Sequence, residues 1–183
     1  MTSSPMHEMA MGTFAPMLRT LSTLLDKGAE HAREKRLDAT ELPESKLAPD
    51  MFPLTKQVQI ACDFAKNAAA RLSGREPPRF EDNEKTLDEL KARIARTLSY
   101  LEGTEAGSFA GAETREIVIQ IPGDLVLEMT GAQYLRDWAL PHFYFHVVTA
   151  YDILRNKGVS IGKLDYLAHA GYAIRKRSPA AAE

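Results

Sequence analysis

Apolar residues recur at three- and four-residue steps along four long segments of this 183-residue chain. Positions three or four apart lie on the same side of an α-helix, so each segment is expected to form a helix with one apolar face. Such helices bury their apolar faces against one another, and a chain of this length has room for a single bundle. The four segments are residues 5–35, 54–72, 87–101 and 131–156.

The residues at the ends of these segments favour the same boundaries. Thr86 and Glu89 have the spacing of a capping box, which is typical of the first turn of a helix. Gly74 and Gly158 follow the second and fourth segments, where glycine commonly ends a helix. Pro141 lies inside the fourth segment. Because proline has no N–H to donate, a kink or a break is expected just before His142.

A short stretch before the last helix has a different pattern. Residues 116–121 and 125–129 alternate and are rich in β-branched side chains, and Gly123-Asp124 between them is typical of a tight turn. A two-stranded ribbon is marginal alone, so this hairpin should lie against the helices. The sequence therefore predicts an all-α fold, a four-helix bundle with a small β-hairpin before the last helix. We expect one domain over residues 1–183, with about the last ten residues frayed.

Charge and composition exclude several classes of function. The net charge of −2 gives no reason to expect nucleic acid or an anionic membrane as a partner. No apolar run approaches the roughly 20 residues that a membrane span needs. Cys62 is the only cysteine, which excludes an internal disulfide and fits a reducing compartment. With no signal peptide apparent at the N-terminus, we expect a cytoplasmic protein.

His142 and His146 are the strongest candidate site residues. Four residues apart on a helix, their rings lie on one side, and that side continues through apolar residues, so both should point into the protein. They could be two ligands of a divalent metal such as zinc, nickel or iron. Alternatively, they could bond backbone carbonyls, tyrosines or water in the core. Either way they need partners, because an unsatisfied buried polar group costs roughly 1–3 kcal/mol.

Asp63 is the candidate for a third metal ligand. It shares the polar face of the second helix with Gln59, Lys66 and Asn67. That face is either solvated or lines a polar cavity shared with the last helix. No metalloprotease motif, nucleophile elbow or glycine-rich phosphate loop is present, so no reaction follows from motifs.

Several strings in the chain resemble the bacterial DUF1993 family. The most specific are Pro-Asp-Met-Phe-Pro at residues 49–53 and Phe-Tyr-Phe-His at residues 143–146, and the resemblance covers nearly the whole chain. The family is similar to the DinB/YfiT-like superfamily, which implies an up-down-down-up four-helix bundle. The superfamily commonly holds a divalent metal on three histidines, one from the second helix and two from the last. His142 and His146 match the latter two, the second helix has no histidine, and Asp63 is the closest counterpart.

The resemblance leaves three hypotheses for function. The first is a polar, metal-binding site at His142 and His146 with no assignable reaction. The second is a non-catalytic protein that binds a small molecule or a partner, with a water-filled structural pocket and no metal. The third, by analogy with the superfamily alone, is a thiol-cofactor-dependent transferase or isomerase. The resemblance also allows a homodimer, which the sequence neither requires nor excludes.

Overall fold

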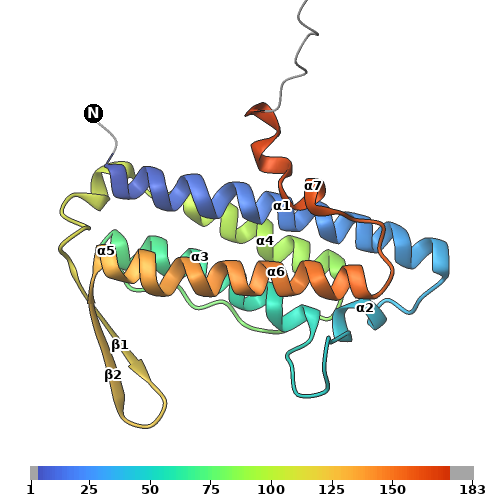
Figure 1. Cartoon of the computed structure of the whole chain (residues 1–183). Helices are drawn as coiled ribbons and strands as arrows, with labels where there is room; N and C mark the ends of the chain where they lie inside the picture. The colour runs from blue at the N-terminus through green and yellow to red at the C-terminus, as the bar shows by residue number, and fades with distance from the viewer. Residues whose placement is uncertain (1–3, 174–183) are drawn as a thin grey trace, which may run out of the picture.

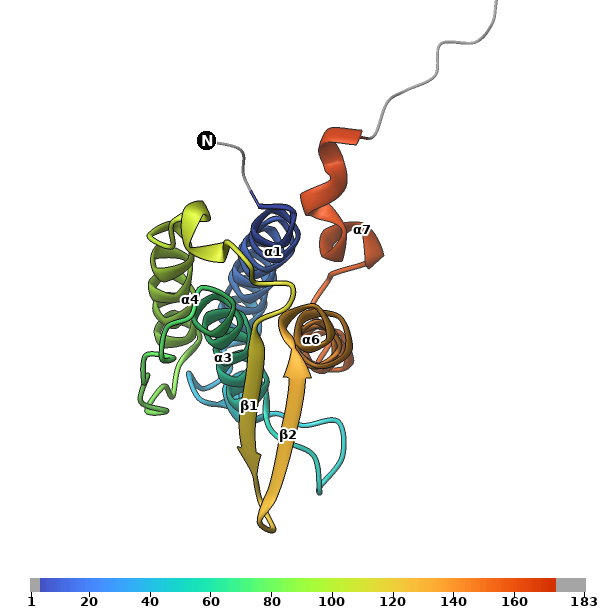
Figure 2. The same ribbon diagram turned by 90° about the vertical axis from the view of Figure 1, so that its left-hand side faces the viewer.

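Four long helices, packed side by side, form the body of the molecule (Figures 1 and 2). The computed structural model describes residues 4–173, so the C-terminal residues predicted to fray lie outside it. The long helices are α1 (Pro5–Lys35), α3 (Leu54–Leu72), α4 (Leu87–Glu102) and α6 (Leu140–Asn156). Shorter elements are α2 (Glu41–Glu44), α5 (Gly131–Gln133), α7 (Lys163–Tyr166), and the 3₁₀ turns Ala106–Phe109 and Ala168–Ala173.

The core lies where the predicted apolar stripes meet. Helix α3 packs against both α6 and α4, and α1 contacts all three other long helices. The alanines of α3 are fully buried, which lets neighbouring backbones approach closely. Thr86 and Glu89 form the predicted capping box at the start of α4. Within the described residues, no helix is both long enough and apolar enough to cross a membrane.

The predicted hairpin is present as β1 (Glu116–Ile121) and β2 (Leu125–Thr130), which pair antiparallel. Gly123 and Asp124 both have positive φ, 89° and 57°, as the tight turn between right-twisted strands requires. At the base of the hairpin, Gly131 passes so close to Ala112 that a Cβ would lie 1.9 Å from its carbonyl oxygen. Only the base packs against the bundle, and the outer half projects away from it, contrary to the expectation that the ribbon lies on the helices (Figure 1).

The last helix is continuous through Pro141 and changes its winding before it. Residues Tyr134–Ala139 form a π-helical stretch between α5 and α6. A proline cannot donate to the preceding turn, and its ring crowds the carbonyl four residues earlier, that of Asp137. A wider π turn relieves this conflict without breaking the helix. The irregularity predicted before His142 is therefore present as a π turn, and the helix does not break.

Candidate functional site

His146 is held in one orientation by a glutamine from the facing helix. Its side chain lies between α6 and α3, only 7% exposed, and its Nδ1 is 2.7 Å from Oε1 of Gln57. The Nε2 of Gln57 donates to the backbone carbonyl of Phe52 at 3.1 Å, so the amide nitrogen is already engaged. The amide oxygen therefore faces the imidazole, and Nδ1 of His146 must carry the proton that it donates.

This bond determines which nitrogen of His146 is free to act. Burial, together with the neighbouring His142, lowers the pKa of His146 to about 4, so the ring is neutral near pH 7. A neutral imidazole protonated at Nδ1 has its lone pair on Nε2. No group among residues 4–173 hydrogen-bonds that atom. His146 thus offers a hydrogen-bond acceptor, base or metal ligand of fixed direction.

His142 lies one helical turn before His146 and contacts two aromatic rings. Its ring stacks on Phe64 of α3, with ring centroids 4.5 Å apart and planes 16° apart. The second contact is with Trp138, whose ring is tilted against that of His142 with centroids 4.4 Å apart. Phe64 is also nearly parallel to His146, at 6.2 Å. Burial lowers the pKa of His142, so both rings tend to be neutral. The structure therefore brings the two predicted histidines together beside aromatic rings, and no charged group among residues 4–173 perturbs either of them.

Asp63, the third predicted site residue, points to a different neighbour. Its Oδ1 is 3.0 Å from Nη2 of Arg93 in α4 and 3.4 Å from Nζ of Lys66. Arg93 also pairs with Asp82, at 3.0 Å, and with Glu84, at 3.1 Å. The polar face of α3 is thus neither simply solvated nor shared with α6. It belongs to an ionic network that holds the connector at residues 75–86 against α3 and α4.

Two buried side chains, Arg93 and Cys62, lie at this network. Arg93 lies among the apolar residues of α4 and its side chain is 1% exposed, and a buried arginine requires acidic partners. Sequence reasoning missed Arg93, and its place among apolar residues is the signal from which a network on the α4 side could have been inferred. Cys62 is fully buried, and burial raises the pKa of its thiol to about 12, so it is a small core residue.

The histidine pair supplies fewer metal ligands than the three histidines that the superfamily implies. Catalytic metal centres usually have three protein ligands and an open position. Within the described part of the chain, no three histidine, cysteine, aspartate or glutamate side chains are grouped so that they could hold a metal ion. The pair offers two imidazole nitrogens, and Gln57 uses its oxygen on His146. The residues therefore do not fit a three-ligand centre.

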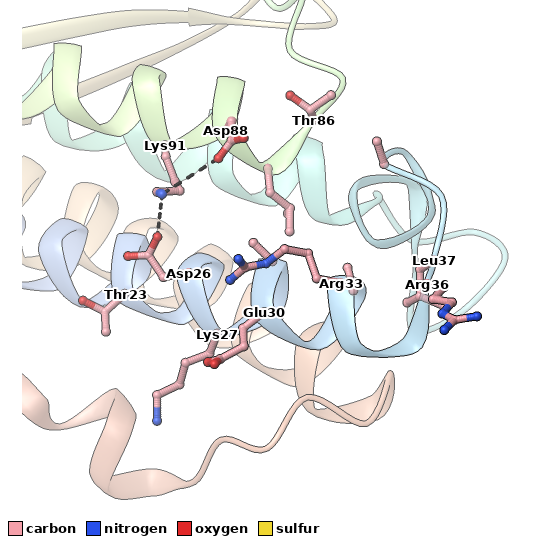
Figure 3. A pocket seen from close by; sticks show the side chains of 14 residues that line it. Thr23, Asp26, Lys27, Glu30, Arg33, Arg36, Leu37, Thr86, Asp88 and Lys91 are labelled. Atoms are coloured by element: carbon pink, nitrogen blue, oxygen red, sulfur yellow. Dashed lines mark ion pairs between the residues drawn. The ribbon is translucent and has the colours of Figure 1, made fainter.

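A surface cavity of about 710 Å³ lies elsewhere, between the C-terminal half of α1 and the start of α4 (Figure 3). Its lining is of mixed charge. Lys91 pairs with Asp26 at 2.5 Å and with Asp88 at 3.9 Å, and both carboxylates are largely exposed. Exposed pairs of this kind contribute little and create no reactive group. The histidine pair is therefore the better candidate site.

The chain matches known families over most of its length. A family model described as "Domain of unknown function (DUF1993)" matches residues 6–167. A crystal structure of a DinB family member protein from Shewanella denitrificans is 42% identical in sequence and superposes with a TM-score of 0.82. The match covers 94% of this chain and 95% of that one. A search of curated proteins found no match.

Proposed function

The chain belongs to the DUF1993 family and is similar to a DinB family member, and from its site we propose that it binds a small ligand at His142 and His146. The observation that carries the proposal is the bond from His146 to Gln57, which leaves Nε2 of a neutral imidazole without a partner among residues 4–173. No reaction is assigned, because among the residues that the structure describes no nucleophile is shown beside the rings.

The surroundings of the pair define the chemistry of the ligand. It would donate an O–H or N–H to Nε2 of His146, because that atom only accepts. Its apolar part would lie against aromatic rings such as Trp138 and Phe145, the latter 59% exposed and 5.2 Å from His146. Within the described part of the chain no charged group touches the rings, so a neutral ligand is favoured over an ion. A small neutral aromatic alcohol or amide has these properties.

Phenol and toluene test this proposal, because they share a ring and differ in the hydroxyl donor. We expect phenol, at millimolar concentration, to shift the ¹⁵N resonance of Nε2 of His146, and toluene to leave it in place. In His146→Gln the affinity for phenol should fall at least about tenfold, the effect of roughly one charge-free hydrogen bond. Equal shifts from both compounds, or none from phenol, would contradict the proposal.

A divalent metal is the second candidate, and the fixed tautomer of His146 favours it. Metal-bound histidines are commonly held by a hydrogen bond from the second ring nitrogen, as Gln57 holds His146. With two protein ligands, such a site would leave the other positions to water or a ligand. Asp63 is engaged by Arg93, so the geometry does not supply it as a third ligand.

Metal analysis of protein purified without a histidine tag tests this candidate. Binding of zinc, nickel or iron that is lost in His146→Ala and unchanged in Asp63→Ala would support a two-histidine site. Loss of binding in Asp63→Ala would support the three-residue site of His142, His146 and Asp63. Less than about a tenth of an equivalent of metal, with none taken up on addition, would exclude both.

We also infer that the four long helices follow one another up, down, down and up, as in the DinB/YfiT-like superfamily. The long connector at residues 73–86 supports this order, because it provides enough chain to return along the bundle so that α3 and α4 run in the same direction. The 42% identity to a DinB family member supports it as well. A crystal structure of the protein would test the order directly.

A further inference from the structure

The segment between α2 and α3, residues 45–53, is a loop that projects from the bundle and is closed at its base (Figure 1). The N–H of Leu54, the first residue of α3, donates to the backbone carbonyl of Ser45 at 2.9 Å and so joins the two ends of the loop. A turn within it is held by a bond from the N–H of Met51 to the carbonyl of Ala48 at 3.1 Å. The loop contains the Pro-Asp-Met-Phe-Pro string, which therefore leads directly into the first turn of α3.

Phe52 presents its backbone carbonyl to α3 in a defined direction. A residue that precedes a proline is restricted to extended backbone, because the proline ring crowds it, and Pro53 imposes this restriction on Phe52. The carbonyl accepts a hydrogen bond from Nε2 of Gln57 at 3.1 Å. Because Phe52 is 55% exposed, its packing contributes little, and the carbonyl is the group through which it acts on the site.

The carbonyl of Phe52, the amide of Gln57 and the imidazole of His146 form a chain in which each hydrogen bond fixes the direction of the next. A backbone carbonyl only accepts, so the amide must present its nitrogen to Phe52 and its oxygen to His146. That oxygen also only accepts, so the proton of the neutral imidazole lies on Nδ1, 2.7 Å away. Gln57 is 2% exposed, so water has little access to the chain. The loop thus acts on the tautomer of His146 across two hydrogen bonds.

The opposite orientation of the Gln57 amide is unfavourable while the loop is in place. Turning the amide over would point its oxygen at the carbonyl of Phe52, and two acceptors would face each other in a buried site. Displacement of the carbonyl would remove this conflict. The amide nitrogen would then donate to Nδ1 of His146, and the imidazole proton would lie on Nε2. The nitrogen that accepts from a ligand would become one that donates.

We propose that the loop at residues 45–53 determines which class of ligand the site binds, by holding the Gln57 amide in one orientation. With the loop closed, Nε2 of His146 accepts, and the site favours neutral ligands that donate a hydrogen bond, such as aromatic alcohols and amides. With the loop displaced, Nε2 donates, and the site favours ligands that only accept, such as aromatic ketones. The choice of ligand rests on the proposed function, whereas control of the tautomer is measurable without any ligand.

Two matched proline variants test control of the tautomer. Pro53→Gly removes the restriction on Phe52, and Pro49→Gly removes a proline from the same loop and leaves that restriction in place. In a long-range ¹H–¹⁵N spectrum recorded without ligand, the ratio of Nε2-protonated to Nδ1-protonated His146 should rise about fivefold in Pro53→Gly, the effect of about one hydrogen bond. It should stay at the wild-type value in Pro49→Gly.

An ester between residues 52 and 53 tests the carbonyl itself. Lactic acid in place of Pro53 makes this ester, and no backbone N–H is lost, because proline has none. An ester carbonyl accepts hydrogen bonds more weakly than an amide carbonyl. The ester protein should therefore have more Nε2-protonated His146 than its matched amide, Pro53→Ala. Equal tautomer ratios in the ester and in Pro53→Ala would overturn the inference.

Phenol and acetophenone then test the choice of ligand, because phenol donates a hydrogen bond and acetophenone only accepts. By titration of the ¹⁵N shifts of His146, the preference for phenol should fall about fivefold in Pro53→Gly and stay unchanged in Pro49→Gly. If the wild type binds phenol and the tautomer ignores both Pro53→Gly and the ester, control by the loop is wrong and the proposed function stands. If the tautomer responds and the wild type does not bind phenol, the loop controls the tautomer and the proposed function is wrong.

Discussion

Helix α3 presents buried polar side chains to two neighbours, and the two sides differ in what they leave unpaired. Toward α4, Asp63 and Gln59 join Arg93 and Glu84 in a network of opposite charges. Toward α6, Gln57 fixes a neutral imidazole whose second nitrogen has no protein partner among the described residues. The charged groups on the α4 side pair with one another and hold the fold together, although Nε of Arg93 is buried there without a partner among the described residues. A neutral group with an unused lone pair is available to something outside it.

Arg93 gives the largest expected effect. Arg93→Met would leave Asp63, Asp82 and Glu84 without their shared cation, and breaking a buried pair in this way costs about 3 kcal/mol of unfolding free energy. Urea denaturation measures the loss. The matched control is Arg96→Met in the same helix, where an exposed guanidinium lies 3.8 Å from the centre of the Phe80 ring. That change should cost about 1 kcal/mol or less. Equal losses would mean that the network is not structural.

The pH dependence of stability should come in part from the other side of α3. The pKa of His146 is about 4 in the folded protein, against 6.5 for an unperturbed histidine. Because the folded pKa is depressed, the unfolded chain takes up the proton first as the pH falls. Stability from this group is complete above pH 6.5 and is lost between pH 6.5 and about 4, by about 3 kcal/mol.

His146→Gln isolates this contribution from that of the carboxylates. The glutamine variant does not titrate at this position, so the difference between its stability curve and that of the wild type reports His146 alone. We expect the difference to change between pH 6.5 and 4 and to be flat above pH 7. A difference that is flat over the whole range would show that His146 is not held neutral.

Two buried glutamines allow the α4 and α6 sides of α3 to be compared with small, matched changes. Gln57 and Gln59 are 2% and 4% exposed, lie two residues apart on α3, and each makes a hydrogen bond to a side chain. Gln57→Leu and Gln59→Leu should each lower the unfolding free energy by about 1–2 kcal/mol. Only Gln57→Leu should alter the ¹⁵N shifts of His146 and the response to phenol. Changes at His146 in both variants would mean that the two sides are coupled.

Local signals in the sequence predicted the elements well. Some signals determine backbone shape by themselves. They are the apolar stripes of α1, α3 and α4, the Thr86–Glu89 capping box and the Gly123-Asp124 turn. Each of them appears where it was predicted. The position of the irregularity caused by Pro141 was predicted correctly, but its form was not. A proline requires that the preceding turn change, but whether the chain kinks, breaks or widens depends on how the rest of the helix packs.

The candidate site could be predicted only in part, for a physical reason. The four-residue spacing brings His142 and His146 together whatever else packs nearby. Periodicity also gives the direction of Asp63 on its own helix, but it does not say which helix lies opposite. Arg93 occupies that place, so Asp63 is paired away from the histidines. Gln57 was missed because a glutamine at the edge of an apolar stripe has no pattern that distinguishes a buried partner from a solvated one.

The tautomer and pKa of His146 test the central claim most directly. A long-range ¹H–¹⁵N spectrum, recorded from pH 7.5 downward, distinguishes a protonated Nδ1 from a protonated Nε2 in each imidazole. We predict that His146 is neutral with its proton on Nδ1 and begins to titrate only near pH 4. A proton on Nε2, or titration near pH 6.5, would contradict the claim that α3 holds a free, neutral nitrogen ready for a ligand.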